Sequence, residues 1–133
     1  MQAQHALSIV MAHGAWCDSK IWRKVVPLLE EQGHRVAAPD LPGCGANRRP
    51  YSQIELETYV ETLVEAASNL PGRLLLVGHS LGGIFVSQAG ERMADRVAGL
   101  LYVSAFMLRD GESQSSAYRR DPAAGALALN RFQ

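Results

Sequence analysis

Short apolar runs alternate along the chain with stretches in which apolar residues recur every three or four positions. The runs are typical of buried strands and cover residues 7–12, 35–38, 74–77 and 97–104. Between them the spacing predicts amphipathic helices: one capped by Asp18 or Ser19 and ended by Gly33, one from Leu56 to Ala67, and one from Leu81 to Met93. This order predicts an α/β fold in three layers, a mostly parallel sheet with helices on both faces.

Local signals refine two of these helices. Pro27 lies inside the first one and predicts either a kink or the start of its main part. Ser52-x-x-Glu55 predicts a capping box at the start of the second helix. In a parallel sheet, ligands bind beyond the carboxyl ends of the strands. We therefore expect the loops at residues 14–18, 40–50 and 105–112 to meet near the turn that follows residue 77.

That turn carries Gly78-x-Ser80-x-Gly82, between a strand pattern and a helix pattern. This context is typical of a nucleophile elbow, in which a sharp strand-to-helix turn exposes a serine hydroxyl. The glycines allow the strand and the helix to approach closely, and the helix N-terminus faces any negative charge that develops. The alternative is a glycine-rich structural turn with an incidental serine, and the flanking strand and helix favour the elbow.

Composition limits the classes of function that the chain is expected to have. The formal net charge is zero and 47% of the residues are apolar, which indicates a globular domain and gives no sign of nucleic-acid or membrane-surface binding. No apolar run is long enough to span a bilayer, and the first residues do not form a secretory signal. Cys17 and Cys44 form neither a disulfide framework nor a metal motif, so we expect a cytoplasmic protein. We also expect no metal or organic cofactor.

Four motifs occur in order along the chain. They are His13-Gly14-Ala15-Trp16, Pro39-Asp40-Leu41-Pro42-Gly43-x-Gly45, Gly78-His79-Ser80-Leu81-Gly82-Gly83 and Val103-Ser104-Ala105-Phe106-Met107. With these motifs the chain resembles the α/β-hydrolase superfamily, and within it the small esterases related to plant methyl-salicylate esterases and hydroxynitrile lyases. The resemblance implies that residues 1–112 are the N-terminal part of a hydrolase core and that residues 113–133 begin a cap region.

The resemblance implies roles for individual residues. Ser80 corresponds to the nucleophile, and the backbone N–H groups of Ala15 and Leu81 correspond to the oxyanion hole. Phe106 is a candidate for lining the pocket. Trp16 is another, or else it anchors its loop.

Other residues near the motifs receive structural interpretations. His13 is expected to hold the oxyanion loop by hydrogen bonds rather than to act as a base, and Asp40 to fix its own loop. His79 is expected to pack away from the serine. For the two cysteines we favour a small apolar role over a nucleophilic one.

The family pattern then breaks. The superfamily's order is serine, acid, histidine, and no histidine follows Ser80 in this chain. Asp110 follows the last strand, where a minority of relatives place the acid. The sequence therefore looks like the N-terminal half of a hydrolase, for which we consider a truncated product, a complementary C-terminal chain, and a binding module that folds alone.

The expected function is hydrolysis of small carboxylic esters through Ser80 and an acyl-enzyme, weak or inactive in this chain alone. The alternatives are a hydroxynitrile-lyase-like reaction, and a non-catalytic ligand-binding protein or inactive gene fragment. The uncovered apolar faces of such a half-sheet predict self-association.

Overall fold

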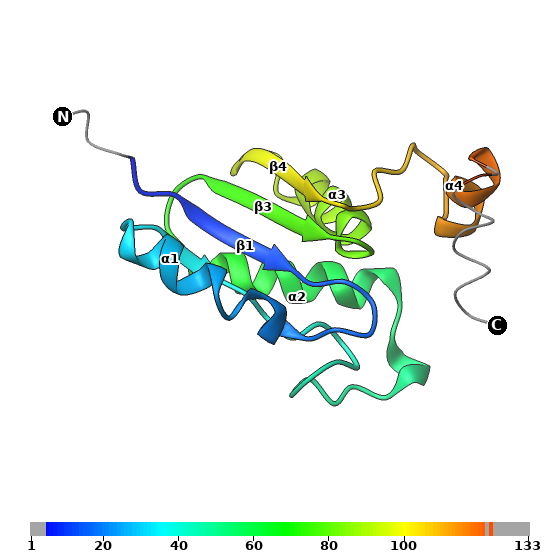
Figure 1. Ribbon diagram of the computed structural model, residues 1–133, viewed down its shortest axis with the longest axis horizontal. Helices are drawn as coiled ribbons and strands as arrows, with labels where there is room; N and C mark the ends of the chain where they lie inside the picture. The colour runs from blue at the N-terminus through cyan, green and yellow to red at the C-terminus, as the bar shows by residue number, and fades with distance from the viewer. Residues whose placement is uncertain (1–4, 122, 124–133) are drawn as a thin grey trace.

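The computed structural model of the chain describes residues 5–121 and residue 123. Its sheet is parallel throughout and has the order β2-β1-β3-β4 (Figure 1). Ser8 at the start of β1 pairs with Arg35 of β2 on one side and with Leu74 of β3 on the other. The strands are β1 (Ser8–Ala12), β2 (Arg35–Ala37), β3 (Leu74–His79) and β4 (Val97–Val103).

Helices cover both faces of this sheet, because the side chains of β1 alternate between two hydrophobic clusters. Ile9 and Met11 pack with Trp22 of the 3₁₀ helix η1 (Ser19–Trp22) and with α1 (Val25–Glu31). Val10 and Ala12 pack with α2 (Leu56–Ser68) and α3 (Gly82–Arg92) on the opposite face. The three-layer α/β prediction is therefore confirmed.

The first predicted helix is two elements. Asp18 caps η1, and its side chain accepts a hydrogen bond from the backbone N–H of Lys20. The α-helix α1 begins only at Val25, so Pro27 falls in its first turn, where a missing backbone N–H costs no helical hydrogen bond. Of the two predictions for Pro27, the start of the main part is correct.

The predicted capping box at Ser52 is wrong. Residues Tyr51–Gln53 form a short 3₁₀ helix, and Glu55 is itself the N-cap of α2, in a reciprocal box with Thr58. Ile54 lies between the predicted cap Ser52 and the observed cap Glu55, and its side chain contacts the loop at Gly43. The helix begins only after this contact.

From β4 onward, the chain becomes more exposed. In β4, the side chains of Leu100, Leu101 and Val103 are 38–49% exposed. The short helix α4 (Gln114–Arg120) follows, with Ser113 as its N-cap. The sequence after Ser113 is polar and then Ala-rich, which predicts weak helix at residues 117–120 and 123–129. The helix α4 confirms the first of these, and the second lies outside the described residues except for residue 123.

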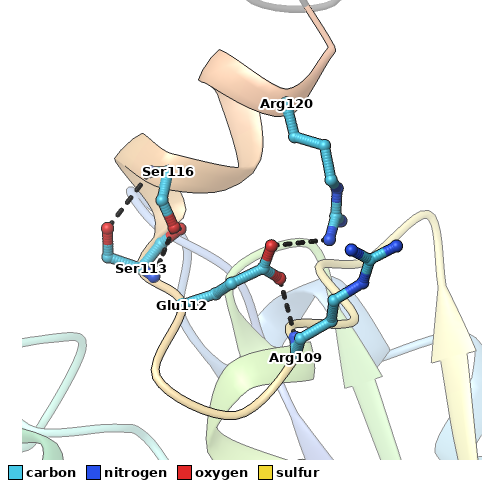
Figure 2. Close-up of polar contacts among 5 residues, drawn as sticks. All are labelled: Arg109, Glu112, Ser113, Ser116 and Arg120. Carbon is cyan, nitrogen blue, oxygen red and sulfur yellow. Dashed lines mark hydrogen bonds and ion pairs between the residues drawn. The ribbon is translucent and has the colours of Figure 1, made fainter.

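A small polar network holds α4 to the segment after β4 (Figure 2). The carboxylate of Glu112 accepts a hydrogen bond from the backbone N–H of Arg109 (2.7 Å) and one from the Arg120 guanidinium (2.6 Å). Phe106 and Tyr118 add an edge-to-face ring contact with centroids 5.5 Å apart.

None of the helices in the described part of the chain is both long enough and apolar enough to cross a membrane.

Candidate active site

The candidate site lies where the strand order of the sheet reverses. The chain passes from β1 outward to β2, then returns to place β3 on the other side of β1. The loops that follow β1 and β3 therefore leave the sheet from neighbouring strands, at the position where open α/β sheets bind ligands (Figure 1). These two loops carry His13-Gly14-Ala15-Trp16 and the Ser80 turn.

Ser80 has the backbone conformation of a strained turn. Its φ is 54°, in the left-handed region that L-residues rarely adopt. The turn is possible because β3 and α3 approach each other through glycines. A Cβ atom added at Gly78 would lie 2.6 Å from the carbonyl oxygen of Gly82, and one added at Gly82 would lie 2.6 Å from the carbonyl oxygen of Ala12.

The segment after β4 supports this turn from the other side. The backbone N–H of Phe106 donates to the carbonyl oxygen of Ser80 (3.0 Å), and the N–H of Ser80 donates to the carbonyl oxygen of Val103 (3.3 Å). Phe106 is half-buried. Leu81 is the N-cap of α3, so its backbone lies at the positive end of that helix dipole.

The loop after β1 is fixed by His13, which is fully buried. The backbone N–H of Leu41 donates to His13 Nε2 (3.0 Å), so the ring proton sits on Nδ1 and is donated to the carbonyl oxygen of Gly14 (2.8 Å). Both ring nitrogens are thus occupied. The prediction that His13 holds the loop by hydrogen bonds is confirmed.

Gly14 brings this loop against the serine. A Cβ atom added at Gly14 would lie 2.9 Å from Ser80 Cβ, closer than two such carbons approach. Ala15, the next residue, is half-buried. Trp16 has a φ of 57° and a side chain that is 85% exposed. The roles predicted for Ala15, Trp16, Leu81 and Phe106 stay predictions.

Asp40 connects the loops after β1 and β2. Its carboxylate accepts hydrogen bonds from the backbone N–H groups of Ser19 (2.8 Å) and Ala46 (2.9 Å). Burial raises the pKa of this carboxyl, but the hydrogen bonds from Ala46 and Ser19 outweigh it, so the net pKa lies below the usual value. The prediction that Asp40 fixes its loop is confirmed.

The cysteines lie in the same two loops and are free thiols, both half-buried. Burial raises the pKa of the Cys44 thiol, and the neighbouring Asp40 and Cys17 raise it further. A thiol with a raised pKa stays protonated and is a poor nucleophile. For Cys44 this agrees with the small apolar role.

Within the described residues, the structure does not bring a base to the serine. No imidazole there is hydrogen-bonded to Ser80 Oγ, since His13 is engaged with its own loop and His34 Nδ1 accepts the backbone N–H of Leu7. Asp110 lines a pocket of about 570 Å³ with Ile84, Ser87 and Glu91, and Ser80 is not among the residues that line it. No group of three or more possible metal ligands occurs in residues 5–121 and 123.

Sequence reasoning missed two features of the site. It did not predict the left-handed backbone of Trp16 and Ser104, because neither is a glycine, the usual signal for positive φ. It also missed the hydrogen bond from Phe106 to Ser80, which joins residues from two different loops. No local pattern marks a backbone-to-backbone contact of that kind.

Known proteins match both the sequence and this geometry. The model of the alpha/beta hydrolase family matches residues 9–132. Methylesterase 8 of Arabidopsis thaliana is 40% identical over 110 residues, which are 80% of this chain and 39% of that protein. The pyrethroid hydrolase of Sphingobium wenxiniae is 37% identical over 107 residues, which are 77% of this chain and 37% of that protein.

A solved structure agrees with these matches. The crystal structure of polyneuridine aldehyde esterase superposes with a TM-score of 0.78 and 31% identity, over 87% of this chain and 47% of that one. The chain therefore spans less than half the length of each of these relatives. Only the N-terminal part of the relatives' fold has a counterpart here.

Proposed function

Because the chain belongs to the alpha/beta hydrolase family, we propose that it carries the nucleophile of a serine esterase that acts on small carboxylic esters. The observation that supports this most directly is the left-handed Ser80 at the end of β3, with Gly14 of the oxyanion loop packed against it. A strained backbone of this kind persists only where the surrounding structure enforces it, and such residues cluster at active sites. The names of the relatives, methylesterase and pyrethroid hydrolase, agree with an ester substrate.

In this proposal, Ser80 Oγ attacks the ester carbonyl and loses its proton to a base. The resulting tetrahedral oxyanion accepts hydrogen bonds from the backbone N–H groups of Ala15 and Leu81. The alcohol leaves with a proton, and water then attacks the acyl-serine to release the acid and restore Ser80. Trp16 and Phe106 would line the pocket for the substrate.

The described residues do not provide the base that accepts the proton of Ser80 Oγ. A serine without a base keeps only the catalysis of its oxyanion hole and binding groups. We therefore propose that this chain alone reacts weakly or not at all with esters. A complementary chain that supplies an acid and a histidine would raise its activity.

A second candidate is a non-catalytic ligand-binding protein. The observation that favours it is the engagement of His13 by Leu41 and Gly14, which leaves Ser80 without an imidazole among the residues of the described chain. In this case the pocket binds a small ester or acid, and the serine stays unmodified.

A fluorophosphonate probe distinguishes the two, because it labels only activated serines. The purified chain is incubated with the probe and compared with Ser80→Ala and with Ser52→Ala, an exposed serine outside the site. Slow labelling that Ser80→Ala abolishes and Ser52→Ala preserves supports the esterase proposal.

A complete lack of labelling in a folded chain, together with saturable binding of a small aromatic ester, supports the binding protein instead. Circular dichroism establishes the folded state of each variant. If Ser80→Ala labels as well as the wild type, the proposed nucleophile is wrong.

A further inference from the structure

Two buried polar atoms behind the oxyanion loop have no protein partner. Trp22 Nε1 and His79 Nδ1 are both shielded from solvent, and neither makes a hydrogen bond to any described residue. Trp22 is only 7% exposed and belongs to the hydrophobic cluster of Ile9, Met11 and Val77. His79 is the residue directly before Ser80.

Such atoms are rare, since more than 90% of buried polar groups in proteins are paired with protein or with ordered water. The two atoms here are also complementary. The indole N–H can only donate, whereas the Nδ1 of a neutral imidazole can accept. Two separate orphaned groups would each cost stability, but one shared partner satisfies both at once.

The two rings are direct neighbours. Their centroids are 6.3 Å apart and their planes are perpendicular, at 89°, an edge-to-face arrangement. A single water molecule bridges two polar atoms that lie roughly 5–6 Å apart, twice the length of an ordinary hydrogen bond, so a shared water requires this closeness of the two rings. Internal waters occupy sites of this kind when at least two polar atoms meet there.

We propose that Trp22 and His79 bind one internal water molecule behind the oxyanion loop. The water accepts the indole N–H of Trp22 and donates one of its own protons to His79 Nδ1. The imidazole is then neutral, with its ring proton on Nε2. This assignment is independent of the function proposed above, because it requires no reaction at Ser80.

The position of the site makes His79 a positioning residue. A Cβ atom added at Gly14 would lie 3.2 Å from His79 Nδ1 and 3.2 Å from the carbonyl oxygen of His79. The hydrated imidazole therefore packs directly under the residue that sets the loop against Ser80. The water ties η1, which carries Trp22, to the same point.

Nuclear magnetic resonance of the isotope-labelled chain tests the proposal without any substitution at the site. The chain has two indole N–H signals, and Trp16→Phe identifies the one from Trp22. The Trp22 signal should show a cross-peak to a long-lived water, with the negative sign of a slowly tumbling complex. An absent water cross-peak, with the Trp22 signal shifted upfield by the imidazole face, would overturn the proposal.

A pair of substitutions adds an independent test. His79→Asn keeps a hydrogen-bonding group near the position of Nδ1, whereas His79→Gln places its amide near Nε2. The water cross-peak should persist in His79→Asn and disappear in His79→Gln, and the Trp22 N–H should exchange faster in the Gln variant. Loss of the cross-peak in both variants or its retention in both would show that Nδ1 does not hold the water.

Discussion

The central strand β1 and the edge strand β4 have similarly apolar sequences and very different surroundings. Every residue of β1 is buried, with neighbouring strands on both sides and helices on both faces. In β4, Leu100, Leu101 and Val103 keep 38–49% of their surface exposed. An apolar run predicts a strand in both places, but only its position in the sheet decides what it contributes to the core.

Ser80 and the loop after β1 lie on the enclosed side of this comparison. They follow β3 and β1, and glycines bring their backbones into direct contact. In β4, by contrast, a Cβ atom added at Gly99 would meet only Leu75 at 3.5 Å, an ordinary contact. The Ser80 turn is thus packed closely against the loop after β1, although the neighbouring strand β4 has an open surface.

The largest expected effect comes from shortening one leucine side chain to alanine in β3 and one in β4. Leu76→Ala in β3 removes a fully buried side chain and should lower the free energy of unfolding by about 3–4 kcal/mol, through lost burial and the cavity that remains. Leu101→Ala, at 49% exposure, should cost less than about 1.5 kcal/mol. Urea denaturation of both variants measures the difference, and equal losses would show that β4 is as enclosed as β3.

A methyl group added to a glycine tests the backbone contacts. In Gly82→Ala the new Cβ would meet the carbonyl oxygens of Ala12, at the end of β1, and of His13, which follows it; both are backbone atoms and cannot rotate away. We expect a loss of about 2–3 kcal/mol, the upper range for overpacking. Gly99→Ala is the control and should be neutral within about 0.5 kcal/mol. Thermal denaturation compares them, and a stable Gly82→Ala would contradict the close approach.

Arg96 connects the end of α2 to the start of β4. Its guanidinium donates to the carbonyl oxygen of Ala67 in the last turn of α2, and to those of Leu70 and Gly72 in the turn that follows. Arg96→Ala should lower the free energy of unfolding by about 1 kcal/mol. Arg73→Ala removes a single hydrogen bond to Val97 and should cost less than about 0.5 kcal/mol in the same urea series. A smaller loss for Arg96→Ala than for Arg73→Ala would contradict this role.

The smallest effect concerns pH. The pKa of Asp40 is lower in the folded chain than its usual value of 3.8, so its ionised form stabilises the fold above that pH. This stabilisation is lost as the pH falls from 3.8 through the lower folded-state pKa. The stability difference between wild type and Asp40→Asn should therefore shrink in that range. Asp95→Asn serves as the control substitution, because the Asp95 side chain has no hydrogen bond or ion pair among the described residues.

Most of the fold follows from local patterns in the sequence. The apolar runs place each strand within two residues of its observed bounds, because a buried strand needs little beyond a short apolar run. The failure at Ser52 has a different origin. Two capping residues compete within four positions there, and the contact of Ile54 with the loop at Gly43 is not visible locally.

The site divides in the same way. Ser80 and His13 can be found from sequence because a motif and its flanking elements mark them. The pairing of Trp22 with His79 cannot, since an indole in a helix pattern and an imidazole in a strand pattern give no sign that they face each other. Hydrogen-bonding partners that depend on tertiary packing require the structure.

The place of β1 in the sheet also has a consequence for the order of folding. Ser8 pairs with Leu74, and the whole of η1, α1, β2 and α2 lies between them in the chain. Closing so long a loop is slow, and the entropy is lost before the contacts form. During synthesis from the N-terminus, β1 therefore cannot complete its pairing until β3 has been made. The packing of the Ser80 turn against the loop after β1 depends on that same pairing.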